Sequence, residues 1–164
     1  MKDLDDARDR YAVGEVTSED LPMIAASALG RGLDSPTLLE LACLHRSDCR
    51  DAPSLFLAAL DELGLLEDID TDWDSRAATV LLRRAENHAP DLLVDDGTPA
   101  ARSAEIAALL HRLAHTEAPL NSDLFELAAY FEVLTVDWYE GYRERAVVAE
   151  QMRLNARRLL HHRY

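Results

Sequence analysis

The sequence predicts an all-α protein, a compact bundle of about seven helices arranged around an apolar helix at residues 36–45. Nearly half of the 164 residues are apolar, at 48%, whereas Gly and Pro number only six each. Long runs of Val, Ile and Thr, which would indicate strands, are absent. Apolar residues instead recur every three or four positions. A chain of this length can bury a sizeable core, so we expect a single domain over residues 1–164.

The stretch at residues 36–45 is the expected centre of the fold. Ser35 is a suitable N-cap, and Pro36 suits the first helical position, where a missing N–H costs nothing. The helix that follows is apolar on nearly all sides, and such a helix belongs inside a protein. We therefore expect its neighbours to wrap around it and four side chains to be buried: Leu38, Leu41, Ala42 and Leu44.

Three other helices are predicted in the first half of the chain. The first has helical apolar spacing over residues 4–12. The second starts at a cap within residues 18–20, because Pro22 is tolerated only in a first turn, and it stops at Gly30. After the central helix, the spacing of residues 51–63 predicts another.

The second half opens with a long helix that begins at Trp73. We expect it to end near His88, because Pro90 disfavours helical geometry in the residue before it. Residues 90–97 would then form a loop, the one candidate hinge between two lobes at residues 1–89 and 98–164.

The remaining helices are predicted to start near residues 98 and 121, and a last one extends to the C-terminus. The helix from residue 121 has the most regular apolar stripe, and Gly141 is expected to break or kink it. That stripe consists of Leu124, Leu127, Ala128, Phe131, Leu134 and Trp138.

Five groups of residues resemble sequences of a known kind. They are Glu19-Asp20-Leu21-Pro22, Gly32-Leu33-Asp34-Ser35-Pro36 with Leu38, Glu40-Leu41-Ala42, Leu60-Asp61-Glu62-Leu63-Gly64 and Ala156-Arg157-Arg158-Leu159-Leu160. They resemble small, acidic, all-helical proteins of actinobacteria, over roughly a third of the chain. The matching residues cap helices or belong to the core. No activity is established for that group, so the resemblance implies a helical fold and no function.

Charge is distributed unevenly along the chain. The formal net charge is −14, yet residues 143–164 carry six Arg against two Glu, a net of +4, which leaves −18 on the other 142 residues. An acidic body argues against nucleic-acid binding, which depends on neutralising phosphates. The arginines at residues 143–163 have two interpretations: packing against the acidic body, or a contact surface for an acidic partner.

The sequence favours a cytoplasmic location. Its first six residues are acidic where a signal peptide needs a basic start. No stretch approaches the ~20 apolar residues of a membrane span, so no membrane association is expected. The two cysteines, Cys43 and Cys49, are too few for a disulfide framework, and we expect reduced thiols.

The predicted partner-binding site is the acidic segment at residues 67–74, which has no basic residue before Arg76. Crowded carboxylates need water or cations, so we expect the acids of this segment to be exposed. Trp73 is ambiguous, because it also leads the apolar stripe of its helix. The alternating acids also match the start of a calcium loop, but the sixth position is Trp73 and the twelfth is Thr79, so an acid-capped helix start is favoured. The predicted site residues are Asp68, Asp70, Asp72, Trp73 and Asp74.

Two other groups have metal-ligand spacing. His111 and His115 are four residues apart on one helix, but no third ligand is evident, and an exposed pair is the simpler interpretation. Cys43, His45 and Cys49 could supply three ligands without a good fourth, and a thiol on the central helix is more simply a small hydrophobic group. We therefore predict no metal and no cofactor.

No catalytic motif of known mechanism is present. The sequence therefore favours a non-enzymatic protein that binds another macromolecule through its acidic surface, such as an immunity-type or regulatory protein with a basic protein partner. The alternative is a helical-bundle enzyme or a ligand or metal carrier with an interior pocket. The sequence is also compatible with a homodimer.

Overall fold

The computed structural model describes residues 2–45, 49–66, 73–94, 99–116 and 122–161. Eight helices and no strand are found within these ranges, which confirms the all-α class. The chain divides into two compact units, residues 1–77 and residues 78–164, named unit 1 and unit 2. Each unit is described separately below.

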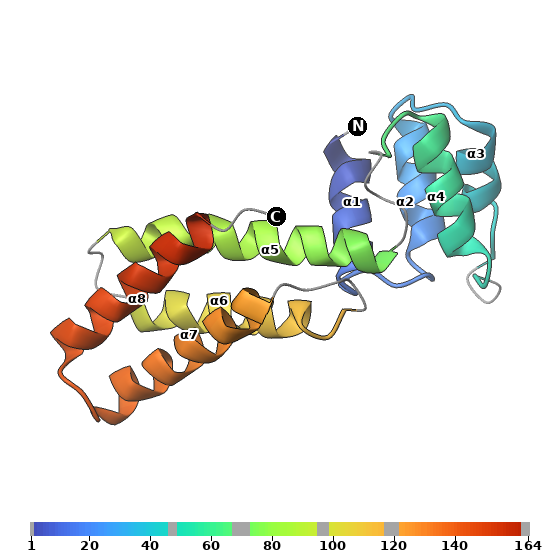
Figure 1. Ribbon diagram of the computed structural model, residues 1–164. Coiled ribbons are helices and arrows are strands. Elements are labelled where there is room, and N and C mark those ends of the chain that lie inside the picture. The colour runs from blue at the N-terminus through green and yellow to red at the C-terminus, as the bar shows by residue number, and fades with distance from the viewer. Residues whose placement is uncertain (1, 46–48, 67–72, 95–98, 117–121, 162–164) are drawn as a thin grey trace. The chain divides into compact units, whose positions relative to one another are not determined.

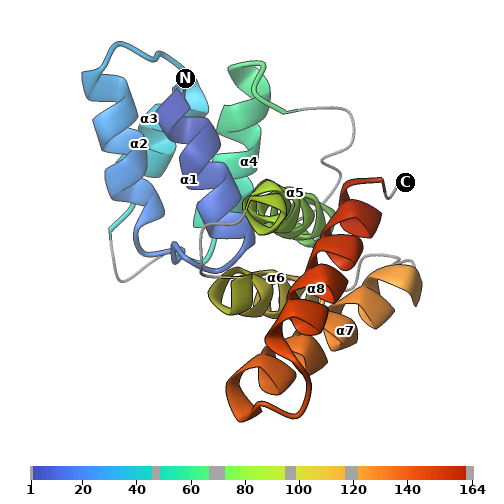
Figure 2. The same cartoon turned by 90° about the vertical axis from the view of Figure 1, so that its left-hand side faces the viewer.

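Unit 1 contains α1 (Lys2–Ala12), α2 (Leu21–Gly30), α3 (Pro36–Ala42), α4 (Ala52–Glu62) and the first turn of α5 (Trp73–Leu93). The helix α3 packs against both α2 and α4, and Figure 2 shows it between them. The core of this unit is almost entirely aliphatic, with one buried phenylalanine. Its fully buried large side chains are Leu4, Leu21, Leu38, Leu41, Phe56 and Leu60.

The short helices of unit 1 start where the sequence predicts, but α3 ends at Ala42, three residues before the predicted end at residue 45. Proline lies in the first turn of α2, α3 and α4, a position at which the absent N–H has no helical partner to lose. After α2, Gly32 has φ +88°, and the N–H of Leu33 returns to the carbonyl of Ala28 at 3.2 Å. Only glycine adopts that conformation readily, so it ends the helix.

The start of α3 is bound to the end of α4 by a hydrogen-bond network. The Ser35 hydroxyl accepts the N–H of Leu38 at 3.1 Å, as the predicted N-cap requires. Glu62 then accepts hydrogen bonds from the hydroxyls of Ser35 and Thr37 and from the N–H of Thr37 at 3.2 Å. These bonds, that from Ser35 most of all, lower the pKa of Glu62 below its ordinary value of 4.5.

One prediction about the central helix is wrong. Leu38 and Leu41 are fully buried, as expected. Ala42 and Leu44, however, are only half-buried, and Leu39 is 56% exposed. The physical reason is that α3 is only seven residues long and packs between α2 and α4, which leaves its third side to solvent. It is a core helix of unit 1 with an exposed side, rather than a helix enclosed on all sides.

A buried charge network joins α1 to the start of α5. The guanidinium of Arg76 is 4% exposed, and its Nε donates to Oδ1 of Asp9 at 2.9 Å. The buried Arg8 lies beside the same carboxylate, with its Nε 3.6 Å from Oδ1, and it also donates to the carbonyl of Leu65. Buried cations are stable only when such partners surround them.

Unit 2 contains the rest of α5 together with α6 (Pro99–Leu113), α7 (Ser122–Glu140) and α8 (Arg145–Leu160). Figure 1 shows α6 and α7 running side by side, and their shared surface is the most extensive between any two described helices. The predicted stripe of α7 is confirmed, since all of its members are buried except the half-buried Trp138. Gly141 has φ +70° and separates α7 from α8, where the sequence predicts a break or kink. The described residues contain eight helices, against about seven expected.

A polar contact lies inside the α6–α7 surface. Ser103 is fully buried, and its hydroxyl donates to the carbonyl of Phe131 at 2.9 Å. Thr135 donates to the Ser103 hydroxyl at 2.9 Å and to the same carbonyl at 2.7 Å. The two hydroxyl groups and the carbonyl therefore have hydrogen-bond partners within an otherwise apolar surface.

The predicted end of the fifth helix near His88 is also wrong, because α5 continues through Pro90 to Leu93. Proline removes one helical hydrogen bond, but the last turn buries Ala89 and Leu92. Polar contacts with α6 add to this, as His88 lies 3.4 Å from Glu105 and Asp91 forms an ion pair with Arg102 at 3.3 Å. The division between the two compact units falls at residues 77 and 78, within α5.

Candidate functional site

The predicted acidic segment lies largely outside the described residues, as Asp68, Asp70 and Asp72 do. Of its described members, Asp74 is exposed. Trp73 is half-buried and packs against the core of unit 1, where its ring lies 4.6 Å from that of Tyr11 and 6.2 Å from that of Phe56. Of the two roles open to Trp73, its position favours packing over contact with a partner.

The two histidines with metal-ligand spacing have different environments. Nε2 of His111 lies 3.0 Å from a carboxylate oxygen of Glu132 on α7, so this side chain links α6 to α7. His115 is exposed beyond the end of α6. Across the part of the chain that the structure describes, no group of three or more His, Cys, Asp or Glu residues could hold a metal ion.

The two cysteines lie between α3 and α4, in the residues that follow the end of α3. Cys43 is exposed and Cys49 is half-buried, with its thiol 3.4 Å from the carbonyl of His45. The expectation that Cys43 serves as a buried hydrophobic group is wrong, because this position faces the exposed side of α3. The residues between His45 and Cys49 lie outside the described ranges.

Most arginines of the basic C-terminal segment are engaged within unit 2. Arg143 pairs with Asp137 through an Nε contact of 2.7 Å. Arg145 lies over the ring of Trp138 and Arg158 over that of Tyr130, at 5.4 and 5.8 Å from the ring centroids. The remaining two described arginines, Arg153 and Arg157, lie 3.4 and 3.5 Å from Glu150. These contacts favour intramolecular packing as the role of the segment.

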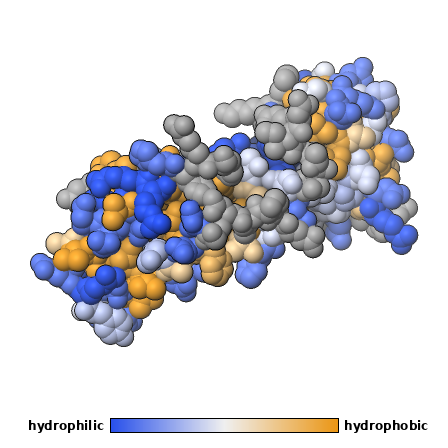
Figure 3. All heavy atoms as spheres, in the orientation of Figure 1, coloured by the Kyte–Doolittle hydropathy of each residue, from blue (hydrophilic) through white to orange (hydrophobic). Residues whose placement is uncertain are grey.

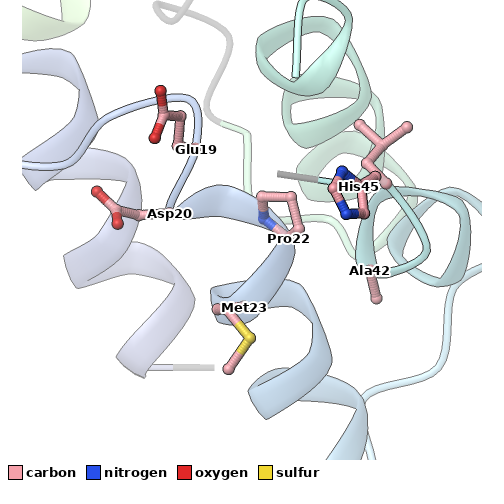
Figure 4. Close-up of a pocket in the computed structure, with 7 residues that line it drawn as sticks. Glu19, Asp20, Pro22, Met23, Ala42 and His45 are labelled. Carbon is pink, nitrogen blue, oxygen red and sulfur yellow. The ribbon is translucent and has the colours of Figure 1, made fainter. Parts of the chain in front are cut away.

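The most distinctive concave feature of unit 1 is a depression of about 340 Å³ between the start of α2 and the end of α3. Figure 4 shows that Pro22 and Met23 enter it from α2, Ala42 and His45 from α3 and the residues after it, and Glu19 and Asp20 from the turn before α2. Leu44 completes the lining. The floor is therefore apolar and one rim is acidic.

Two local interactions shape this rim. Asp20 accepts hydrogen bonds from the N–H of Thr17 at 3.0 Å and from its hydroxyl at 2.7 Å, which fixes the turn that carries Glu19.

Met23 is 74% exposed, although it is a large apolar residue near the start of a helix. A flexible thioether side chain in such a place is typical of surfaces that contact partners.

A second depression, of about 400 Å³, lies on the other side of Met23, between α1 and α2. Its lining mixes both signs of charge: Asp6, Arg10, Asp20 and Arg31. It therefore offers no selectivity for a cation or an anion. Of these two depressions, the one between α2 and α3 has acids and no arginine in its lining.

Sequence reasoning missed the depression but could have found Met23. The apolar stripe of α2 includes Leu21, Ile24 and Ala25, and Met23 points away from it on a helical projection. The sequence around Ala42 and Leu44 does not indicate that they line the depression, because their position there depends on how α3 packs against α2.

None of the described helices has both the length and the apolar character that crossing a membrane requires. Comparison with known proteins gives no match, whether with family models, with curated proteins or with solved structures. The resemblance to actinobacterial helical proteins thus stays a prediction.

Proposed function

We propose that this chain is a non-enzymatic protein that binds a basic protein partner through the acidic surface of unit 1. The observation that carries the proposal is the acid-rimmed apolar depression between α2 and α3. An immunity-type or regulatory role, in which the partner's basic surface is neutralised, is consistent with that chemistry.

The charge of unit 1 supports the proposal. Residues 1–77 contain 18 acidic and seven basic residues, a net of −11 out of −14 for the chain. A surface field of this sign attracts a cationic partner and raises the rate of encounter, and added salt screens it.

The depression indicates which part of a partner it accepts. Lysine and arginine side chains have an aliphatic stem and a charged end. The stem fits over Pro22, Met23 and Ala42, and the cation then lies near the carboxylates of Glu19 and Asp20. The volume of about 340 Å³ is at the lower end of the range for binding pockets, so one or two side chains fill it.

The methyl group of Met23 provides a direct test. The chain has three methionines, Met1, Met23 and Met152, and Met152 is buried in unit 2. In protein carrying ¹³C-methyl methionine, titration with a short peptide of alternating leucine and arginine should shift the Met23 resonance and leave that of Met152 in place. The matched peptide of leucine and glutamate should not shift it.

Two single substitutions in unit 1 test whether the peptide binds at the depression. Glu19→Gln should lower the affinity for the leucine–arginine peptide by about two- to fivefold, as expected for the loss of one exposed ion pair. Glu40→Gln removes an equal charge from an exposed site on α3 outside the depression and should change little. Equal effects of the two variants would contradict the assignment. A free alkylamine that shifts Met23 as strongly as the peptide would favour a small-ligand carrier instead.

The acidic segment at residues 67–74 remains part of the proposal as a prediction. Replacement of Asp68, Asp70, Asp72 and Asp74 by asparagine should leave far-UV circular dichroism unchanged and slow association of the arginine peptide. If the affinity and its salt dependence are unchanged in that variant, the segment does not belong to the binding surface.

A further inference from the structure

The helix α7 has two apolar faces, and only one of them is covered. Phe125, Ala129, Val133 and Val136 recur every three or four residues on the side opposite the buried stripe. All four are exposed, Phe125 by 58%, Val133 by 54% and Val136 by 47%. We call these four residues the outer stripe. Figure 3 shows apolar residues at the surface of unit 2 in the region of α7 and α8.

All the charged residues in the sequence of α7 are acids. The sequence of α7 contains five acids and no Lys, Arg or His. Three of the acids have partners, since Glu132 contacts His111, Asp137 is paired with Arg143, and Asp123 also has an interaction within the chain. Glu126 and Glu140 are exposed and have no ion-pair partner among the described residues. The outward side of α7 therefore combines an apolar stripe with uncompensated negative charge.

We propose that the outer stripe docks an amphipathic basic helix of another protein. Residues 125–136 span about three helical turns, or roughly 16 Å, a length suited to one face of a short helix. Ala129 lies between the larger Phe125 and Val133, and its small side chain leaves space for a ridge of the partner helix. Lysine or arginine at the edges of that helix would meet Glu126 and Glu140.

The same charges disfavour the other occupants of an apolar face. If two copies met stripe to stripe, Glu126 and Glu140 of one copy would lie close to those of the other, and like charges that face each other disfavour such a contact. An anionic membrane would be repelled for the same reason. The inference concerns unit 2 and is independent of the depression in unit 1.

The probe is a fluorescein-labelled helical peptide of leucine and lysine, with leucine at i, i+3, i+4 and i+7, and its matched control replaces lysine by glutamate. Fluorescence anisotropy with the full chain should show binding of the lysine peptide that weakens as salt is raised. The glutamate peptide should not bind. Equal affinity for both peptides would overturn the proposal.

Two pairs of variants locate the binding. V133S/V136S should raise the Kd of the lysine peptide about tenfold, as expected for loss of central apolar contacts. V147S/L154S changes two exposed apolar residues of α8 and should leave the Kd within about twofold. E126Q/E140Q should slow association and flatten its salt dependence, more than the unit 1 control E40Q/D61N does.

Three further results would overturn the proposal. The first is an equal effect of the two serine variants. The second is a dimer in sedimentation velocity that V133S/V136S disperses, which would make the outer stripe an interface between copies. The third is binding of phosphatidylcholine vesicles that the same variant abolishes, which would make it a membrane contact. The Met23 titration is unaffected by any of these outcomes, so the two proposals can fail separately.

Discussion

The two units are stabilised by different kinds of interaction. In unit 1, helices of 7 to 11 residues are joined by polar contacts, those of Glu62 with Ser35 and Thr37 and those of Asp9 with two buried arginines. In unit 2, helices of 15 to 21 residues pack along an extended apolar surface that encloses a small buried polar contact at Ser103. The other polar contacts between these helices, such as Asp91 with Arg102 and His111 with Glu132, lie in more exposed positions. Short helices are unstable alone, so unit 1 depends on caps and charge pairs to a degree that unit 2 does not.

The units also differ in what they leave exposed. Unit 1 has most of the net charge and a concave site of single-side-chain size, whereas unit 2 is nearly balanced at −3 and exposes a convex stripe on one helix. The difference predicts different partner elements, an extended basic segment for unit 1 and a helix for unit 2. Each unit contains one tryptophan, Trp73 or Trp138, so single-tryptophan variants report on the two units separately.

The largest effect is expected from Asp9→Asn. The change removes the carboxylate that compensates the buried Arg76 and Arg8, and breaking such a pair costs about 3–5 kcal/mol. Urea unfolding followed by Trp73 in a Trp138→Phe background measures it. Asp6→Asn, an exposed acid 3.9 Å from Arg10, is the control and should change stability by less than about 1 kcal/mol. Similar small losses for both would mean that unit 1 does not depend on its buried charges.

Leu41→Ala should destabilise unit 1 by about 2–5 kcal/mol, because the side chain is fully buried between helices. Leu39→Ala on the exposed side of α3 should change stability by no more than about 0.5 kcal/mol. The same Trp73 measurement applies. A loss well below 1 kcal/mol for Leu41→Ala would show that α3 is peripheral.

A smaller effect is expected in unit 2 from Ser103→Ala. The hydroxyl joins α6 to α7, and losing one such hydrogen bond costs about 1 kcal/mol. Leu110→Ala, an apolar deletion in the same helix, should cost about 2–5 kcal/mol. Trp138 fluorescence in a Trp73→Phe background reports both. If Ser103→Ala proved the more damaging, unit 2 would depend on polar contacts as unit 1 does, and the comparison would fail.

The smallest effect concerns pH. The pKa of Glu62 is lowered in the folded state, so its contribution to stability is fully present above its ordinary value of 4.5 and is lost as pH falls below that value. The difference in unfolding free energy between the natural chain and Glu62→Gln should therefore shrink between about pH 5 and pH 3. A difference that is constant over this range would mean that the carboxylate is not the group responsible.

Local signals in the sequence account for much of the fold. Ser35 and Pro36 specify the start of α3, and the buried stripe of α7 is readable from its spacing. The contacts that join distant segments are not readable. Nothing near Glu62 indicates that it reaches Thr37, and nothing near Asp9 indicates Arg76, because these pairs are 25 and 67 residues apart.

Two errors have a common physical cause, which is that tertiary packing overrides a local rule. Pro90 disfavours a helix locally, yet α5 continues because its last turn buries Leu92. Leu39 belongs to an apolar segment, yet it is exposed because two neighbours cannot cover three sides of a helix. The outer stripe of α7 is a different case, since the spacing of Phe125, Ala129 and Val133 is visible in the sequence. What the sequence does not reveal is that this second apolar face of α7 stays exposed.

The central claim is that α7 has one face for packing and another for a partner. Urea unfolding followed by circular dichroism, on Leu134→Ala and on V133S/V136S, tests it most directly. Leu134 is 4% exposed, so its truncation should cost about 2–5 kcal/mol. V133S/V136S should leave the unfolding free energy within about 0.5 kcal/mol of the natural chain, because both valines are exposed. If V133S/V136S lost as much stability as Leu134→Ala, the outer stripe would be part of the folded core and the claim would be wrong.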